Sequence, residues 1–224
     1  MEQKNVYSEE TFAYFNYDDI KIETTSVIDV EIKNCNLYLD IYGNLVILGE
    51  LKNTSSTSKT DLEITFDFYS RDGEKIFSDV RESKIENLYP KEKTPFYFLL
   101  KEKSIYIDIA RVKIGLNYSN FYKGFEGNPV VREEKYYYED NFLIIEGELV
   151  NLSQNRIEDI ILLCTFYDKF GKVAFIKQCY IPRKELSSLG REKFSLKLML
   201  DEYLPEFSSY SFSVSYKDAL KVKA

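Results

Sequence analysis

Histidine is absent from the 224 residues of this chain. Its absence excludes nucleophile pairs in which His activates Ser or Cys, zinc sites that use His ligands, and most general-base schemes. The side chains that remain for chemistry are carboxylates, Lys, Tyr and three thiols. Any catalytic or metal site would have to be built from these groups.

Adjacent carboxylates occur at Asp18-Asp19 and at Glu133-Glu134. Carboxylate pairs can serve as acid and base in glycoside hydrolysis, where they normally lie over a deep cleft. Both pairs sit in charged runs, a pattern typical of solvated strand edges. The clusters YDDIKIE and YYYEDN could offer oxygen ligands to calcium, but neither has the alternating acidic loop with its Gly. We therefore predict no catalytic residue and no metal site.

The three cysteines are Cys35, Cys164 and Cys179, an odd number without close spacing. This arrangement favours neither a disulfide framework nor a zinc site. Cys164 falls at an inward position of an alternating segment, so we expect it in a core. The stretch GFEGNP lacks both the spacing and the Lys of a phosphate loop. We expect no cofactor and regard a small-molecule ligand as disfavoured.

The net charge is -7, and no basic stripe of the kind that binds phosphates is present, so nucleic acid is not an expected partner. No run of eighteen apolar residues could span a membrane, and MEQKNVYSEE lacks the pattern of a signal peptide. We expect a soluble chain. Its location stays open between the cytoplasm and, if a leader or anchor was removed, the cell envelope or the exterior. The abundant Lys and Glu with few Gly and Pro are typical of thermophiles.

A near-repeat stands out in the chain: GNLVILGELKNTS at 43–55 returns as NFLIIEGELVNLS at 141–153. The same offset of 98 residues relates further pairs, among them Asp61 and Asp159, Phe68 and Phe166, Gly73 and Gly171, Phe96 and Phe194, and Tyr118 and Tyr216. Two copies of this length are too few for a solenoid. The pattern predicts tandem globular domains that arose by internal duplication.

Within each copy the apolar residues alternate with polar ones. Leu45, Ile47, Gly49 and Leu51 share one face of the first segment, while Glu50 and Lys52 share the other. The sets Leu62, Ile64, Phe66, Phe68 and Ile160, Leu162, Cys164, Phe166 follow the same rule. This period of two predicts antiparallel strands with one buried face and one solvated face. With turn signals such as Asp72-Gly73 and no amphipathic helix, it indicates all-β, immunoglobulin-like antiparallel β-sandwich domains.

The strand that ends each central segment carries a recognisable motif. It reads Phe66-Asp67-Phe68-Tyr69-Ser70 in the first copy and Cys164-Thr165-Phe166-Tyr167-Asp168 in the second. Together with the run Gly-x-Leu-x-Asn-x-Ser and a later Glu-Lys before Phe, it resembles the bacterial and archaeal FxLYD domain family over residues 40–118 and 138–216. Each copy departs from the motif once, at Ser70 and at Cys164. The resemblance implies a small β-sandwich, often of envelope proteins and lipoproteins, without catalytic residues.

The predicted organisation has five parts. Residues 1–24 form a partly flexible N-terminal segment, 25–118 the first sandwich, 119–129 an aromatic connector, 130–217 the second sandwich, and 218–224 a tail. The connector SNFYKGFEGNP holds three aromatic residues, more than a free tether would expose. We therefore expect the two domains to touch.

The two copies differ at positions that could bind a partner. On the predicted outer face, Glu63 and Thr65 of the first copy become Ile161 and Leu163 in the second, and with Tyr167 these form an apolar stripe. The stripe could be covered by a neighbouring strand or loop, or could contact the first domain, a second subunit or a partner. Tyr136, Tyr137 and Tyr138 form a second candidate surface, since Tyr suits ligand and peptide contacts but is also an ordinary strand residue.

The residues thus favour a protein without enzymatic activity. The first hypothesis is a protein-interaction or structural module, with a protein partner or self-association and with the prokaryotic cell envelope as one setting. The alternative is a carbohydrate-binding module that uses exposed Tyr. Fold alone does not decide between them.

Overall fold

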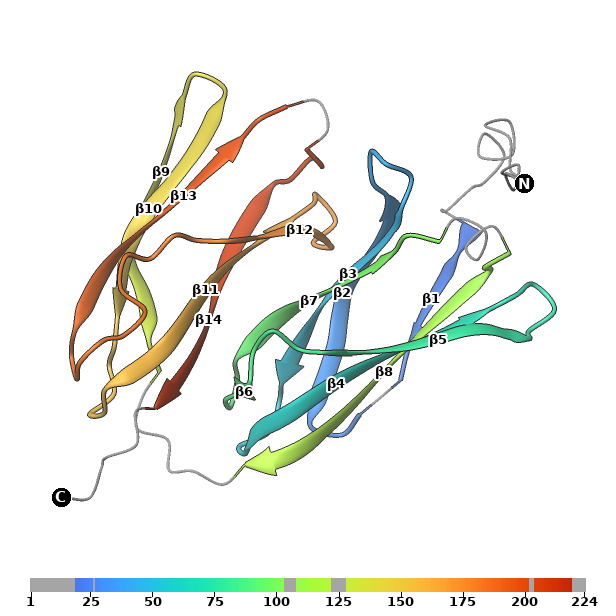
Figure 1. The fold of residues 1–224 in the computed structure, drawn as a ribbon, viewed down its shortest axis with the longest axis horizontal. Coiled ribbons are helices and arrows are strands. Elements are labelled where there is room, and N and C mark those ends of the chain that lie inside the picture. Colours follow the sequence, from blue (N-terminus) through green and yellow to red (C-terminus); the bar gives the residue numbers. More distant parts are fainter. Residues whose placement is uncertain (1–18, 26, 103–107, 122–127, 202–203, 219–224) are drawn as a thin grey trace, which may run out of the picture.

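The computed structural model describes residues 19–25, 27–102, 108–121, 128–201 and 204–218. These residues form an all-β sandwich fold, as the alternation predicts, with no α-helix among them. No helix in this part of the chain is long and apolar enough to cross a membrane. Figure 1 shows two groups of strands side by side, one from each half of the chain.

The first group, here the N-terminal unit (19–121 as described), contains two sheets. One has the order β1-β8-β4-β5 with β6 paired to β4, and the other has the order β2-β3-β7. The strands are β1 (Lys21–Thr24), β2 (Val30–Leu39), β3 (Leu45–Asn53), β4 (Ser58–Tyr69), β5 (Lys75–Glu82), β6 (Asn87–Leu88), β7 (Lys93–Leu100) and β8 (Arg111–Phe121).

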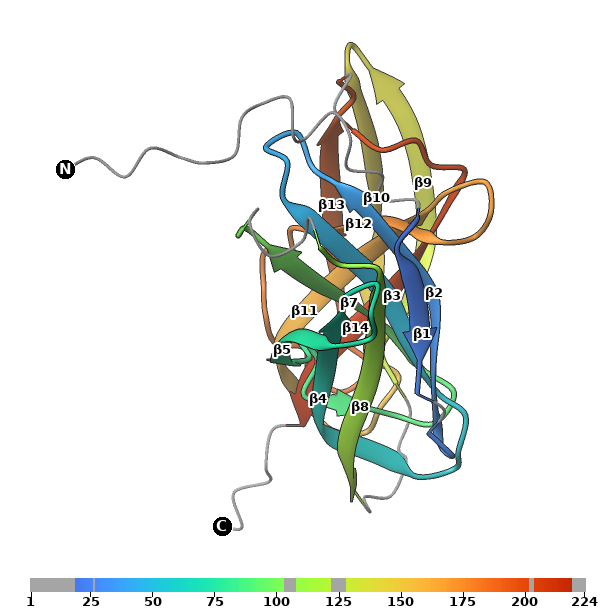
Figure 2. The ribbon, with the colours of Figure 1, turned by 90° about the vertical axis from the view of Figure 1, so that its right-hand side faces the viewer.

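The second group, the C-terminal unit (128–218 as described), also contains two sheets, of orders β13-β10-β9 and β12-β11-β14. The strands are β9 (Val130–Glu139), β10 (Phe142–Val150), β11 (Ile157–Tyr167), β12 (Val173–Gln178), β13 (Arg191–Met199) and β14 (Ser209–Asp218). Figure 2 shows the same strands from the side. The segments expected as strands from their alternation are all strands in the structure.

Each unit has its own apolar core between its two sheets. In the N-terminal unit the inward residues of β3 and β4, such as Leu45, Ile47, Phe66 and Phe68, are buried together. In the C-terminal unit Ile160, Leu162, Cys164 and Phe166 of β11 occupy the core. Cys164 is therefore a small core residue, as predicted.

Positions that are 98 residues apart share local backbone geometry as well as residue type. The bulge in the β4–β8 ladder between Thr60 and Glu63 has a counterpart in the β11–β14 ladder between Glu158 and Ile161. Asp61 has a positive φ of 51° in the first bulge and Asp159 one of 52° in the second. The hairpin glycines Gly73 and Gly171 have φ of 84° and 77°, a region that glycine adopts without steric cost. The two units are thus built to one plan, while duplication and the immunoglobulin-like assignment stay predictions.

The repeated motif has a structural role in both units. A Cβ on Gly49 would lie 2.4 Å from Cζ of Phe96, and one on Gly147 would lie 2.8 Å from Cε1 of Phe194, so each glycine makes room for the ring paired across the sheet. Asn53 is fully buried and donates to the carbonyls of Thr57 and Leu88. Asn151 donates in the same way to Asn155 and Leu186. These amides fix the turns that follow β3 and β10.

One strand lies outside the predicted boundaries. The sequence predicts a partly flexible N-terminal segment at residues 1–24, yet Lys21–Thr24 form β1, which pairs in parallel with β8. Parallel pairing here depends on a strand ninety residues away, so four residues of local pattern do not reveal it. Of the connector 119–129, residues 122–127 lie outside the described part of the chain, as do 219–224 of the tail.

Candidate functional site

The two units meet through the outer face of β3 and the end of β11. Val46 and Leu48 of β3 form an apolar cluster with Tyr167 and Val173 of the C-terminal unit. Tyr38, Leu99 and Ile176 pack around it. Asn36 also donates to the carbonyl of Val173 at 3.0 Å. The domains therefore touch in the structure through a buried surface of both units.

A polar network crosses this contact. The Tyr167 hydroxyl donates to Oε1 of Glu50 at 2.5 Å and accepts from Nζ of Lys93 at 2.5 Å. Lys93 also lies 3.2 Å from Oε1 of Glu50, and Asn34 donates to Oε2 at 2.7 Å. Because Glu50 is only 1% exposed, its carboxylate oxygens take their hydrogen bonds from these partners in place of water. The network thus stabilises one arrangement of the two units.

The Tyr167 phenol is held in its protonated form. Burial raises its pKa well above the ordinary range, and the hydrogen bond to the Glu50 carboxylate raises it further. A protonated phenol can donate to the carboxylate at any physiological pH. The Lys93 Nζ lies at the hydroxyl edge of the ring, 4.7 Å from the ring centroid.

A second contact joins the loop before β7 to the end of β14. The rings of Tyr89 and Tyr216 stack with centroids 5.2 Å apart, and the Tyr216 hydroxyl donates to Oδ1 of Asn128 at 2.9 Å. Asn128 in turn donates to the carboxylate of Glu92. Burial raises the pKa of Glu92 to about 7. The hydrogen bonds from the Tyr89 amide and from Asn128 favour the ionised form and lower the pKa, but the effect of burial is larger.

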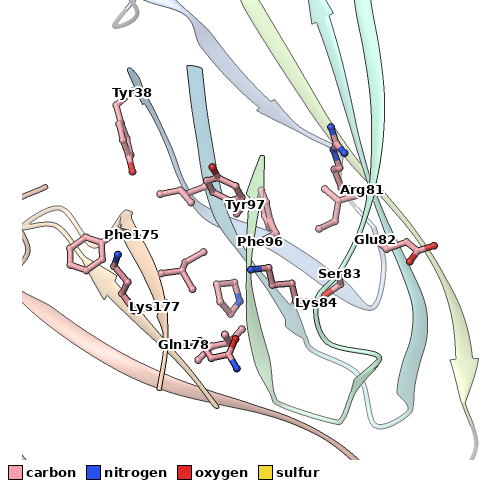
Figure 3. A pocket seen from close by; sticks show the side chains of 15 residues that line it. Tyr38, Arg81, Glu82, Ser83, Lys84, Phe96, Tyr97, Phe175, Lys177 and Gln178 are labelled. Atoms are coloured by element: carbon pink, nitrogen blue, oxygen red, sulfur yellow. The ribbon is translucent and has the colours of Figure 1, made fainter. Parts of the chain in front are cut away.

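Beside the first contact lies a cleft of about 510 Å³ with walls from both units, and Tyr38, Leu48 and Ile176 belong to both. Its floor is apolar and includes Leu48, Phe96, Leu163 and Phe175. Figure 3 shows Phe175 and Lys177 on the C-terminal wall, with Tyr97 and Arg81 on the N-terminal side. Concave, largely apolar sites with a few polar groups are the usual form of a binding site.

The rim of this cleft is cationic although the chain as a whole is acidic. Arg81, Lys84 and Lys177 line it, and all three are exposed. Glu82 is the one carboxylate among the lining residues. Arg81 also forms an ion pair with Asp79 at 2.6 Å, so Lys84 and Lys177 contribute most of the excess positive charge. Because low-dielectric walls focus the field of such charges, an anionic group on an apolar ligand would be favoured here.

The thiols of the described chain are poor nucleophiles. Burial raises the pKa of Cys35 to about 12 and that of Cys179 to about 12, and it raises the pKa of Cys164 further still. The thiolate, which is the reactive form, is therefore scarce at neutral pH. Within the described residues no group of three or more His, Cys, Asp or Glu could hold a metal ion.

The three residues of the predicted apolar stripe lie in different environments in the structure. Tyr167 is buried against the N-terminal unit, and Leu163, 2% exposed, lines the cleft. Ile161 is half-buried and pairs with Ser215 of β14. Of the alternatives left open by the sequence, contact with the first unit is the one that the structure displays for Tyr167.

The second predicted surface is separate from the cleft. Tyr136, Tyr137 and Tyr138 lie on β9 and are 59%, 40% and 64% exposed. The rings of Tyr136 and Tyr138 meet edge to face at 84°, so they do not form one flat platform.

Glu50 and Lys93 were missed as interface residues. Glu50 was expected to face solvent because it alternates with the core residues of β3, but the C-terminal unit covers that face. A signal was present in the sequence: Val46 and Leu48 make the same outer face apolar. Only the second unit explains why a carboxylate among them is buried.

No protein-family model and no curated protein matches the chain. Among solved structures, red sea bream transglutaminase is similar at 7% identity and a TM-score of 0.28, over 86% of this chain and 29% of that one. An Amycolatopsis orientalis exo-chitosanase is similar at 11% identity and a TM-score of 0.28, over 82% and 25%. The chain thus spans less than a third of these proteins, and similarity at this level carries no argument about function.

Proposed function

We propose that this chain is a non-catalytic protein-interaction module that binds an apolar, acidic segment of a partner in the cleft between its two units. The observation that carries the proposal is the cleft itself, with an apolar floor and with Arg81, Lys84 and Lys177 on its rim. The high thiol pKa values support a role without nucleophilic chemistry. The resemblance to the FxLYD family supports the prokaryotic cell envelope as the setting.

The two contacts between the units support this proposal. A cleft with walls from two domains keeps its shape only when the domains are held together. The Glu50, Lys93 and Tyr167 network bridges the two units and uses groups that lose their partners if the units separate. A preformed cleft lowers the entropy cost of binding.

Charge reversal at the rim tests the proposal. The probe is a labelled five-residue peptide with two adjacent phenylalanines flanked by aspartates, and binding is followed by fluorescence anisotropy. Replacing both Lys84 and Lys177 by Glu should weaken binding about tenfold or more, since it turns attraction into repulsion.

The matched control replaces Lys101 and Lys169 by Glu, because both are exposed and neither lines the cleft. It carries the same change in net charge. Equal loss of binding in the two double variants, or no saturable binding by the unaltered chain, would contradict the proposal.

Carbohydrate binding on β9 is the second candidate, favoured by the exposure of Tyr136, Tyr137 and Tyr138. Soluble glycans should then quench Tyr fluorescence, and Tyr136→Ala with Tyr138→Ala should abolish the quenching. Indifference to a broad glycan array would eliminate this candidate.

A further inference from the structure

Among the residues that the structure describes, one edge of the C-terminal unit lacks a strand that the N-terminal unit has. In the N-terminal unit β8 lies between β4 and β1. Its counterpart β14 pairs with β11 alone among the strands that the structure describes. The register is the same in both units, since Phe66 pairs with Ile114 and Cys164 pairs with Phe212. The outer edge of β14 is therefore the position that β1 fills on β8.

The core-facing side chains of β14 are more exposed than their counterparts on β8. On β8, the core-facing Val112, Ile114 and Leu116 are buried, in one cluster with Ile20 and Ile22 from the β1 region. Their counterparts on β14, at the offset of 98, are Tyr210, Phe212 and Val214, and all three are only half-buried. Apolar side chains that a strand would cover thus stay partly in contact with water.

The edge of β14 also lacks the features that normally prevent strands from pairing. Ser209–Tyr216 contains neither a charged residue nor a proline. The other edge strands longer than two residues all contain charged residues, although β7 has only Lys93 at its start together with Pro95. In β14 the charged residues, Lys217 and Asp218, lie at the end of the strand. Charges and proline are the usual protection of exposed edges, so the stretch Ser209–Tyr216 presents an edge that is open to pairing.

A hollow of about 480 Å³ lies along this edge. Tyr210–Val214 line one side, Val130, Val131 and Glu134 of β9 line another, and Lys91–Lys93 of the N-terminal unit close it. In the N-terminal unit β1 contacts β2, the counterpart of β9. The hollow thus occupies the place that β1 takes in the first unit, and none of its lining residues lines the interdomain cleft.

We propose that the outer edge of β14 accepts an extended segment of a partner protein, which pairs in parallel and places an apolar side chain at every second residue into this hollow. The chain's own β1 shows the required chemistry: Ile20 and Ile22 face the core while Lys21 and Glu23 alternate with them. The carbonyls of Ala110, just before β8, and of Ile114 on β8 accept from Lys21 N and Thr25 N. The corresponding carbonyls belong to Ser208, just before β14, and to Phe212 on β14. Addition of a strand to a sheet edge is a common mode of peptide recognition.

The site goes beyond the proposed cleft, and two synthetic peptides test it on the full chain. One has the sequence Asp-Ile-Lys-Ile-Glu-Thr-Thr, that of residues 19–25, and the other alternates Val and Thr. A control peptide has the first composition with its two isoleucines adjacent. Binding is measured by calorimetry, and backbone amide exchange is followed by NMR.

Both alternating peptides should bind saturably, and the control peptide at least about tenfold more weakly. The amides of Tyr210 and Phe212, counterparts of Val112 and Ile114 on the β1-paired edge, should exchange more slowly in the complex. Val214→Lys places a charge in the hollow and should weaken binding about tenfold or more. Met199→Lys, on the exposed edge strand β13, should bind as the unaltered chain does.

Thermal unfolding of Val214→Lys shows whether the variant is folded. If it is not, Val131→Lys on the opposite side of the hollow replaces it. Failure of both alternating peptides to bind, equal binding of the control peptide, or protection at Val112 and Ile114 in place of Tyr210 and Phe212 would overturn the proposal. A dimer of the unliganded chain that protects the β14 amides would overturn the assignment to a partner protein.

Discussion

At the scale of single residues, the two repeated Asn residues and the half-buried Glu92 lead to the most specific predictions about stability. Asn53 and Asn151 are fully buried and hold the turns after β3 and β10 through donated hydrogen bonds. Both lie in sequences that match a glycosylation site, yet their amides are committed to the fold. The donated hydrogen bonds show that both act as turn residues.

Replacing Asn53 by Ala should lower the free energy of unfolding by about 2–3 kcal/mol, because several buried backbone groups lose their partner. Asn151→Ala should have a similar effect. Urea unfolding measures both, with the exposed Asn117→Ala as the control. A loss below about 0.5 kcal/mol in either buried variant would show that the amide bonds contribute little.

Glu92 should make stability depend on pH. Its pKa is about 7 in the folded chain against an ordinary value of 4.5, so the folded state holds a proton that the unfolded state has released. The stabilising contribution is fully present below pH 4.5 and is lost as the pH rises through about 7. Its size is of the order of 2 kcal/mol.

Urea unfolding of the unaltered chain and of Glu92→Gln between pH 4 and pH 8 measures this contribution. The variant should gain stability relative to the unaltered chain as the pH rises, whereas the exposed Glu63→Gln should not. A constant difference between Glu92→Gln and the unaltered chain would mean that Glu92 does not titrate in this range.

At the scale of the elements, the strands follow from alternation, and the exceptions have physical reasons. The pattern predicts β3, β4 and β11 because each has one core face along its whole length. β1 was not predicted, since it has only four residues and is ordered by pairing with β8. In the candidate site, Leu163 and Tyr167 were recognised as apolar residues on an outer face. Glu50 was not, because a charged residue at an alternating position indicates solvent unless the second unit is known.

The pairing of β3 with β7 makes Gly49 sensitive to any side chain. Gly49→Ala would place Cβ within 2.4 Å of the Phe96 ring and should cost about 1–3 kcal/mol. Adding Phe96→Leu should recover part of that loss, since the smaller side chain frees the space. Urea unfolding of the two single variants and the double variant tests this, and strictly additive effects would contradict a steric cause.

At the scale of the whole molecule, the network around Glu50 couples the two units. Tyr167→Phe removes one donor from the buried carboxylate and should lower the free energy of unfolding by about 1–3 kcal/mol. In a double-variant cycle with Glu50→Gln, the coupling energy should be about 1–2 kcal/mol. The exposed Tyr180→Phe serves as the control. A coupling near zero would show that the bond contributes nothing to the contact between the units.

The central claim is that a cleft shared by both units binds a protein segment. Its most direct test is an NMR titration of the labelled full chain with the phenylalanine and aspartate peptide. Saturable shifts should cluster at Arg81 and Tyr97 of the N-terminal unit and at Leu163 and Lys177 of the C-terminal unit, which line the cleft. Shifts confined to one unit, shifts centred on Tyr136–Tyr138, or no saturable shift at all would contradict the claim.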